Sequence, residues 1–404
     1  MPVGLPLAGE VLPVDGVALA AAAAGIKAGA ELDVVLISLA EGSTTVGVFT
    51  RNAFCAAPVT ICKDHLEINE PRCFIINSGN ANAAVGVHGI EDALHVCEVI
   101  SASSDFGKQQ VLPFSTGVIG ERLPVDKIIY ACPQLLADLS ADGWQRAARG
   151  IMTTDTRPKA CSQQVKINGS PVTITGICKG SGMIRPDMAT LLVYLTTDAA
   201  IEKSLLQSLL QSAVDQSFNR ITVDTDTSTN DSCVLSATHK SGISINADDE
   251  SLSLFSTALT DLCQQMAQEI VRDAEGASKF VEVKVEQGKD SAECLAIAYS
   301  IAESPLVKTA FFASDANWGR IVMAIGKAGV PDLNTGLIDI WLGSVPIVRN
   351  GERDPDYHED KGSDVMRQEE ILVRVSLGRG SMAESIWTCD LSHDYVRINA
   401  EYRT

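Results

Sequence analysis

The 404-residue sequence predicts an α+β fold built from packed layers of strands and helices. Three observations predict it. Short apolar or alternating segments typical of strands recur along the chain, amphipathic segments lie between them, and a wholly apolar strand follows a glycine-containing polar junction near mid-chain. Because every sheet and helix must bury an apolar face against another element, such a mixture folds as layers, and we expect the mid-chain strand at the centre.

The predicted N-terminal strands are short and rich in apolar or β-branched residues. They are residues 33–40, 44–50, 58–62 and 72–76. The alanine-rich residues 17–26 suit a short helix or a packed loop instead. The polar string Asn77-Ser78-Gly79-Asn80-Ala81-Asn82 directly follows a predicted strand. It is explained as a loop, or as one wall of an active site formed by crowded amides at a strand end.

Helices are predicted where apolar residues recur with helical spacing. They are residues 90–100, 125–139, 144–152, 201–218 and 253–272, and a segment beginning at Ser304. Pro133 is expected to kink or break its helix, because proline removes a backbone hydrogen bond. Residues 314–320 form a predicted turn before 321–325. Two late segments, 280–286 and 371–377, alternate as strands do.

Composition excludes several functions. The formal net charge of −19 and the lack of a Lys/Arg stripe argue against nucleic-acid and anionic-membrane partners. The uncharged N-terminal run is too short to span a bilayer, and it lacks a basic leader. The eleven cysteines contain no CxxC pair, and the six histidines no HExxH spacing, so we expect reduced thiols, a cytoplasmic location and no metal.

The organising stretch of the chain is residues 179–195, KGSGMIRPDMATLLVYL. Its polar half starts at Lys179 and turns through Pro186, and Ala189-Thr190 then opens into an apolar run that reads as a buried strand. By periodicity alone, Thr190 is simply the first residue of that strand. The functional hypothesis is that Thr190 is a nucleophile whose own α-amine is its base, and this requires cleavage of the peptide bond before Thr190.

Such a cut has plausible chemistry. A threonine hydroxyl held against the preceding carbonyl can attack it, shift the acyl group from nitrogen to oxygen, and leave an ester that water opens. Ala189 is small enough for close approach, and the upstream glycines and Pro186 can bend the segment. The released α-amine would have a pKa of roughly 8, so a useful fraction of it would be neutral at pH 7.

Other polar segments have both a structural and a functional explanation. Ser115-Thr116-Gly117 is a weak signal for a backbone oxyanion hole, and most such turns are structural. The hydroxyls of residues 153–156 suit a helix-end cap. The acids between 219 and 232 fail the calcium-loop template for want of its glycine and terminal glutamate. Glu275 sits near the end of a helix, where the dipole disfavours an acid, so another group is expected to hold it.

The segment KGSGMIRPDMATLL resembles the self-cleavage site of the glutamate/ornithine N-acetyltransferases of arginine biosynthesis, and other segments along nearly the whole chain agree. The sequence departs from the family pattern at Arg185 and Asp187 and keeps the Ala189-Thr190 junction. The resemblance implies acetyl transfer from N2-acetyl-L-ornithine to L-glutamate through an acetyl ester of Thr190. The implied reaction requires no cofactor, and acetyl-CoA is a second candidate donor of the acetyl group.

The resemblance also implies an architecture and a set of site residues. We expect an αββα sandwich cut into an α part, residues 1–189, and a β part, residues 190–404, with two copies of each in a heterotetramer. Thr116 and Gly117 match the oxyanion-stabilising pair. The substrate-binding positions that it implies are Thr153, Thr154, Lys179, Thr190, Glu275, Asn399 and Thr404.

Two rival functions fit the same residues. An N-terminal-nucleophile aminopeptidase or amidase would use the same threonine but pass the acyl group to water. A non-catalytic chain would keep the bond between Ala189 and Thr190 intact. Formation of acetate at equal rates with and without glutamate would indicate the first, and an uncut chain would indicate the second.

Overall fold

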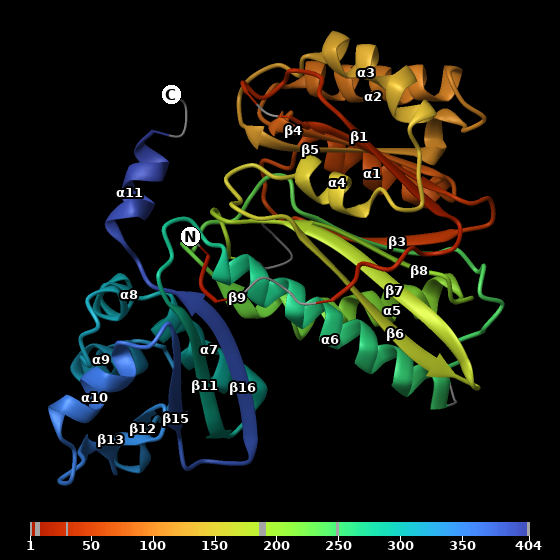
Figure 1. The fold of residues 1–404 in the computed structure, drawn as a ribbon. Coiled ribbons are helices and arrows are strands. Elements are labelled where there is room, and N and C mark those ends of the chain that lie inside the picture. Colours follow the sequence, from red (N-terminus) through yellow and green to blue (C-terminus); the bar gives the residue numbers. More distant parts are fainter. Residues whose placement is uncertain (1, 5–8, 30, 186–190, 248–249, 402–404) are drawn as a thin grey trace. The chain divides into compact units, whose positions relative to one another are not determined.

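The computed structural model describes residues 2–4, 9–29, 31–185, 191–247 and 250–401, and the chain forms two compact units (Figure 1). The described part of the larger unit comprises residues 9–29, 31–185, 191–219, 226–247 and 250–267. That of the smaller unit comprises residues 2–4, 220–225 and 268–401. Ala189, Thr190 and Thr404 lie outside the described residues.

The larger unit is built on two sheets. The strands of the first, in spatial order, are β1 (Val17–Ala22), β2 (Val34–Leu39), β4 (Cys73–Asn80) and β5 (Val111–Val118). Those of the second are β3 (Thr44–Phe49), β10 (Ser232–Ala237), β8 (Leu192–Thr197), β7 (Ser170–Lys179) and β6 (Lys159–Ile167). β8 pairs parallel with β10 and antiparallel with β7, so the apolar strand after Thr190 is central, as predicted.

A shared apolar core joins the two sheets. Phe114 of the first sheet meets Tyr194 of the second edge to face, with ring centroids 5.1 Å apart, and Phe74 packs beside both. Alternate residues of β4, such as Ile75, point to the opposite face. Period-two alternation therefore gives the first sheet two buried faces, one toward the second sheet and one toward helices.

Helices cover the outer faces of both sheets. α2 (Val87–Ala102) and α3 (Val125–Ala137) lie on the first sheet (Figure 1). α5 (Lys203–Asp215) and α6 (Glu250–Arg272), which belongs to the larger unit as far as residue 267, lie on the second. At Gly176 an added Cβ would lie 2.6 Å from Leu195 and 3.1 Å from the Met266 sulfur, so this glycine lets α6 pack closely. The predicted αββα sandwich is confirmed.

The smaller unit contains one seven-stranded sheet. Its strands in spatial order are β14 (Glu352–Arg353), β13 (Val345–Arg349), β12 (Asp339–Leu342), β15 (Glu370–Ser376), β11 (Phe280–Gly288), β16 (Met382–Cys389) and β9 (Ile221–Thr222). Its other helices are α7 (Ser291–Ala302), α8 (Pro305–Phe312), α9 (Trp318–Gly326), α10 (Glu359–Met366) and α11 (His393–Ala400). Val281, Val283 and Val285 of β11 are buried, as the alternation predicts.

Two N-terminal predictions were wrong. Residues 17–22 form strand β1, not a helix or loop, because the backbone pairs with β2 along its length and alternate side chains enter two apolar clusters. Residues 58–62 belong to helix α1 (Ala57–Ile68), which has Pro58 in its first turn, where proline is tolerated. In each case a short apolar run carried no period that separates strand from helix.

Two helical predictions need smaller corrections. The turn expected over 314–320 is shorter, since α9 already begins at Trp318, capped by the Asn317 side chain. α3 (Val125–Ala137) continues through Pro133, and α4 (Trp144–Gly150) follows it.

Candidate functional site

Three neighbouring strands bring polar residues to the start of β8. In the sheet register, Lys179, the last residue of β7, stands opposite Leu192, and so does Ser232, the first residue of β10. The Ser232 N–H donates to the Leu191 carbonyl at 2.9 Å. Since Thr190 precedes Leu191 in the chain, the residues at these strand ends are the candidate functional site.

The Lys179 side chain brings together predicted site residues that are distant in sequence. Its ammonium group donates to Thr116 Oγ1 at 3.1 Å and to Thr153 Oγ1 at 3.0 Å. Thr116 is buried in β5, whereas Thr153 and Thr154 lie partly exposed in the loop after α4. The structure therefore brings the Thr116, Thr153 and Lys179 side chains into direct contact.

Gly117 occupies a conformation and a space that exclude a side chain. Its φ is +134°, and an added Cβ would lie 2.3 Å from the carbonyl carbon of Gly79. Gly79 is its register partner in β4 and also has a positive φ, +103°. The close approach of these two backbones fixes the peptide between Thr116 and Gly117, which is the part of an oxyanion hole that must be rigid.

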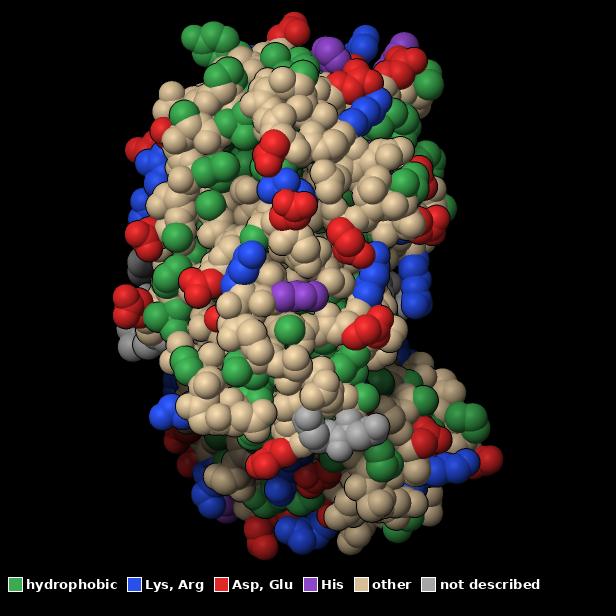
Figure 2. All heavy atoms as spheres, turned by 90° about the vertical axis from the view of Figure 1, so that its right-hand side faces the viewer, with side chains coloured by type: hydrophobic (Ala, Val, Ile, Leu, Met, Phe, Trp, Pro, Cys, Tyr) green, Lys and Arg blue, Asp and Glu red, His purple; other side chains and the backbone are tan. Residues whose placement is uncertain are grey.

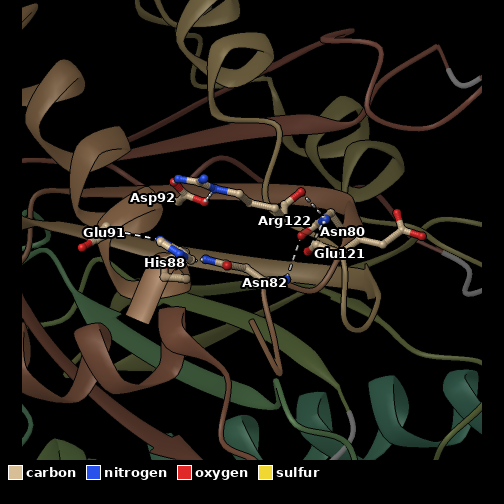
Figure 3. A network of polar contacts seen from close by, with 8 residues as sticks. Asn80, Asn82, His88, Glu91, Asp92, Glu121 and Arg122 are labelled. Carbon is tan, nitrogen blue, oxygen red and sulfur yellow. Dashed lines mark hydrogen bonds and ion pairs between the residues drawn. The ribbon is translucent and has the colours of Figure 1, made fainter. Parts of the chain in front are cut away.

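The asparagine-rich string is held by its own amides. Asn77 Nδ2 donates to the Asn80 carbonyl at 2.8 Å. Asn80 Nδ2 donates to the Glu121 and Arg122 carbonyls (Figure 3). Asn80 Oδ1 accepts from the Asn82 N–H at 2.8 Å. Residues 77–80 extend β4 instead of forming the expected loop. These amides stabilise the ends of β4 and β5, and thereby position Thr116 and Gly117.

Asp155, which the sequence analysis did not single out, is the buried anion of the site. It accepts from Lys159 Nζ at 2.7 Å, the Gly180 N–H at 2.8 Å and the Thr153 N–H at 3.0 Å. Burial alone would raise its pKa, but the ammonium groups of Lys159 and Lys179 outweigh burial and hold the pKa of Asp155 well below its usual range. Asp155 thus orients both Thr153 and the backbone beside Lys179.

Lys27 is a second residue that the sequence did not reveal. Its ammonium group donates to the Met152 carbonyl at 2.8 Å, and its stem fills the space beside Gly79, 2.5 Å from where a Cβ would stand. The Asp33 carboxyl group holds the backbone N–H groups of Ile26 and Lys27. Burial lowers the pKa of Lys27, although Asp33 and Asp155 act in the opposite direction.

Asn230, which directly precedes Asp231 and was also missed, ties the segment before β10 to β5 and to the residue after β4. Its Nδ2 donates to the Ala81 carbonyl at 2.6 Å and to the Ser115 carbonyl at 2.9 Å. Ser115 directly precedes Thr116. The only sequence signal was the density of polar residues between 219 and 232, which did not distinguish Asn230 from its neighbours.

The smaller unit brings two further predicted residues together. Asn399 Nδ2, on α11, donates to Glu275 Oε2 at 2.7 Å, and Glu275 is buried. This bond provides the partner that the acid near the end of α6 was expected to have. Gly276 has a φ of +69°, and an added Cβ would lie 2.4 Å from the Tyr395 nitrogen. The glycine therefore allows α11 to approach the Glu275 backbone.

The described surface and cysteines agree with the composition. Figure 2 shows Lys and Arg side chains scattered among Asp and Glu on the face in view. All eleven cysteines are free thiols. Within the described ranges, no helix is both long and apolar enough to cross a bilayer, and no group of three His, Cys, Asp or Glu side chains is placed to hold a metal.

The four-layer sandwich gathers an ammonium group, hydroxyl groups and a buried carboxylate near the start of its central strand, and these are groups that enzyme sites use. The family model of the ArgJ family matches residues 18–404, and the chain belongs to that family. This confirms the resemblance drawn from the 179–195 segment.

Two relatives agree with the family, and two solved structures are similar to parts of the chain. The chain is 53% identical to the arginine biosynthesis bifunctional protein ArgJ of Methylococcus capsulatus over 98% of this chain and 97% of that protein. It is 52% identical to the Pseudomonas fluorescens protein of the same name over the full length of both. A crystal structure of ArgJ from Bacillus halodurans is 38% identical, with a TM-score of 0.49, and covers 51% of this chain and 97% of that one. Ornithine acetyltransferase of Mycobacterium tuberculosis, complexed with ornithine, is 34% identical, with a TM-score of 0.38, covering 43% and 93%.

Proposed function

We propose that the enzyme transfers the acetyl group of N2-acetyl-L-ornithine to L-glutamate in arginine biosynthesis, through an acetyl ester of Thr190. One observation carries this proposal: the register places Lys179 and Ser232 opposite Leu192, and Lys179 in turn contacts Thr116. The residues proposed as oxyanion holder and substrate ligand thus converge on the strand that Thr190 precedes. Membership of the ArgJ family supports the same activity.

The reaction begins with self-cleavage between Ala189 and Thr190. The freed α-amine of Thr190 then serves as the base for its own hydroxyl, which attacks the acetyl carbonyl of acetylornithine. The Thr116 hydroxyl and the Gly117 N–H stabilise the oxyanion. Ornithine leaves, glutamate binds in its place, and its amine takes the acetyl group from the ester in a ping-pong cycle.

The charged residues select an amino-acid substrate. The Lys179 ammonium group binds the α-carboxylate, and Thr153 and Thr154 supply neighbouring hydroxyls. Glu275, oriented by Asn399, binds the amine end of ornithine, and Thr404 completes the set. Water must be excluded from the acetyl ester, because hydrolysis would turn the transferase into a deacetylase.

Thr190→Ala tests the proposal directly. The variant should remain a single chain of 42.9 kDa and lose acetyl transfer, whereas mass spectrometry of the active wild-type protein should find a fragment that begins with Thr190. The matched control is Thr196→Ala, which removes a buried hydroxyl farther along the same strand. A Thr190→Ala variant that still processes normally would refute the proposal.

The acceptor distinguishes a transferase from a hydrolase. With acetylornithine as donor, acetylglutamate should form only when glutamate is present, and free acetate should stay low. Acetate that forms at one rate with and without glutamate would assign an amidase instead. Acetyl-CoA with glutamate, in place of acetylornithine, tests the second donor, and we propose that neither reaction needs a cofactor.

We further propose that the two cleaved parts, residues 1–189 and 190–404, stay associated as a heterotetramer with two copies of each. Strands from both sides of the cut share one sheet, since β3, β6 and β7 precede it and β8 and β10 follow it. This sharing supports the association of the parts. The free thiols and the biosynthetic family support a location in the cytoplasm. Native mass measurement tests the stoichiometry.

A further inference from the structure

Asp231 is a buried acid placed at the start of the central strand. It is 4% exposed and immediately precedes Ser232, the register partner of Leu192. Its carboxyl group accepts from the Leu191 backbone N–H. The nitrogen of Leu191 is bonded to the carbonyl carbon of Thr190, so the carboxyl group lies at the peptide bond that directly follows the proposed nucleophile.

One oxygen of this carboxyl group, Oδ2, is buried and has no hydrogen-bond partner among the described residues. Burying a polar atom without a partner costs about 1–3 kcal/mol, so such atoms in a native structure require an explanation. Asp231 is also anchored through its backbone, because its carbonyl accepts from the Thr50 N–H at 3.0 Å. The carboxyl group is therefore held rigidly with one oxygen unused.

The proposed self-cleavage needs a base that the nucleophile cannot supply. Before the cut, the nitrogen of Thr190 is part of an amide and does not accept a proton, so the α-amine that serves acetyl transfer does not yet exist. A second group must take the hydroxyl proton while Thr190 Oγ1 attacks the Ala189 carbonyl. The Asp231 carboxyl group binds the next N–H along the chain and has one unused oxygen, and these two features make it the candidate for that task.

We propose that Asp231 carries the proton during self-cleavage. Its carboxylate takes the proton of the Thr190 hydroxyl as the bond between Thr190 Oγ1 and the Ala189 carbonyl carbon forms. It returns that proton to the Thr190 nitrogen as the carbon–nitrogen bond breaks, which leaves an ester and a free amine. Water then hydrolyses the ester to give the Ala189 carboxylate and the Thr190 hydroxyl. This inference rests on the proposed function.

The electrostatic setting suits a proton carrier. Burial raises the pKa of the Asp231 carboxyl well above its ordinary value, although the Lys179 ammonium group and a hydrogen bond from Ser228 act in the opposite direction. A carboxylate with a raised pKa is a stronger base than a solvated one and loses less driving force when it accepts a hydroxyl proton.

Asp231→Asn tests the inference in the full chain. Labelled precursor is synthesised briefly at neutral pH, transferred to buffers between about pH 4 and pH 9, and followed by denaturing gel from the 42.9 kDa band to its two fragments. Because general acid–base catalysis contributes about 10²–10⁴-fold, we expect Asp231→Asn to slow cleavage at least about 100-fold. Asp231→Glu, which retains the carboxyl group, should recover part of the rate.

The control is Asp226→Asn, which removes an exposed acid from the same loop and should cleave at the wild-type rate. The wild-type cleavage rate should rise with pH as the Asp231 carboxyl ionises, and this rise should be absent in Asp231→Asn. The pH dependence of wild-type cleavage tests the role of Asp231 even if the Asp231→Asn variant folds poorly. Wild-type cleavage that is independent of pH, or Asp231→Asn cleavage at the wild-type rate, would overturn the inference.

The two proposals fail differently. If wild-type protein never yields a fragment beginning with Thr190, the proposed function itself is wrong. If wild-type protein is cut, Thr190→Ala is not, and Asp231→Asn is cut normally, the self-cleaving transferase stands and only the role of Asp231 is refuted.

Discussion

Asp155→Asn should destabilise the larger unit severely, because it removes the negative member of a buried ion pair. The Lys159 and Asp155 side chains are both fully buried, with Nζ and Oδ1 2.7 Å apart. The substitution keeps the size of the side chain and leaves the positive charge of Lys159 in the interior. It also weakens the bonds that Asp155 accepts from the Thr153 and Gly180 N–H groups.

The expected loss in the free energy of unfolding follows from the way buried ion pairs respond to single and double substitutions. Breaking one by removing a single partner costs about 3–5 kcal/mol, whereas replacing both partners with apolar groups of similar size is often nearly neutral. A loss of this size is a large fraction of the total stability of a domain, about 5–15 kcal/mol. Lys159→Met, added to Asp155→Asn, removes the unpaired buried ammonium group, so the single variant should be much less stable than the double variant.

Urea unfolding of the single and double variants, followed by circular dichroism at neutral pH, measures this double-mutant cycle. The pH dependence gives an independent check. The folded-state pKa of Asp155 is depressed, so its stabilisation is present above about pH 4 and is lost as the pH falls through the folded-state pKa. The gap between wild type and Asp155→Asn should narrow in acid. A single variant within about 1 kcal/mol of wild type at neutral pH would refute the reasoning.

Two further predictions concern the strand ends and the smaller unit. Gly117→Ala should lower the free energy of unfolding in urea by about 2–5 kcal/mol, because it adds a clash with Gly79 to an unfavourable positive φ. The control Gly120→Ala has a positive φ but no atom within 4 Å of the added Cβ, so it should lower that free energy by only about 1–2 kcal/mol. Equal losses in the two variants would contradict the clash. Glu275→Gln should raise KM for acetylornithine about tenfold with little change in the free energy of unfolding, because it removes the charge but keeps an acceptor for Asn399. An unchanged KM in steady-state kinetics would exclude the proposed contact.

The spacing of apolar residues predicted those helices and strands that are long enough to show a regular pattern of burial. Strand β11 alternates along its length, and helix α5 repeats its apolar pairs at helical spacing, so both were predictable. β1 and α1 were not, because an alanine run and a five-residue apolar run have no distinctive period. Pairing with β2 makes residues 17–22 a strand, and packing against β5 and α2 makes α1 a helix.

The site was predictable where its residues lie in continuous motifs and not where folding assembles them. Thr116-Gly117 and Lys179 stand in strings that mark a family. Asp155 and Lys27 stand in ordinary loops, and their importance comes from burial beside charges that are distant in sequence. No local pattern specifies that Lys27 fills the space beside Gly79 or that an acid at position 231 faces the start of β8.

Lysine side chains gather at the site, although the chain as a whole is acidic. The whole chain carries a formal charge of −19, yet among the described residues the ammonium groups of Lys27, Lys159 and Lys179 lie beside the carboxyl groups of Asp33 and Asp155, and burial raises the pKa of Asp231. An excess of positive charge in a partly buried setting attracts the carboxylate of an amino acid more strongly than the same charge in water, because screening is weaker there. If Lys179 binds that carboxylate, as proposed, affinity for acetylornithine should fall with rising ionic strength less steeply than affinity at a surface site, which binding measured at low and high salt would check.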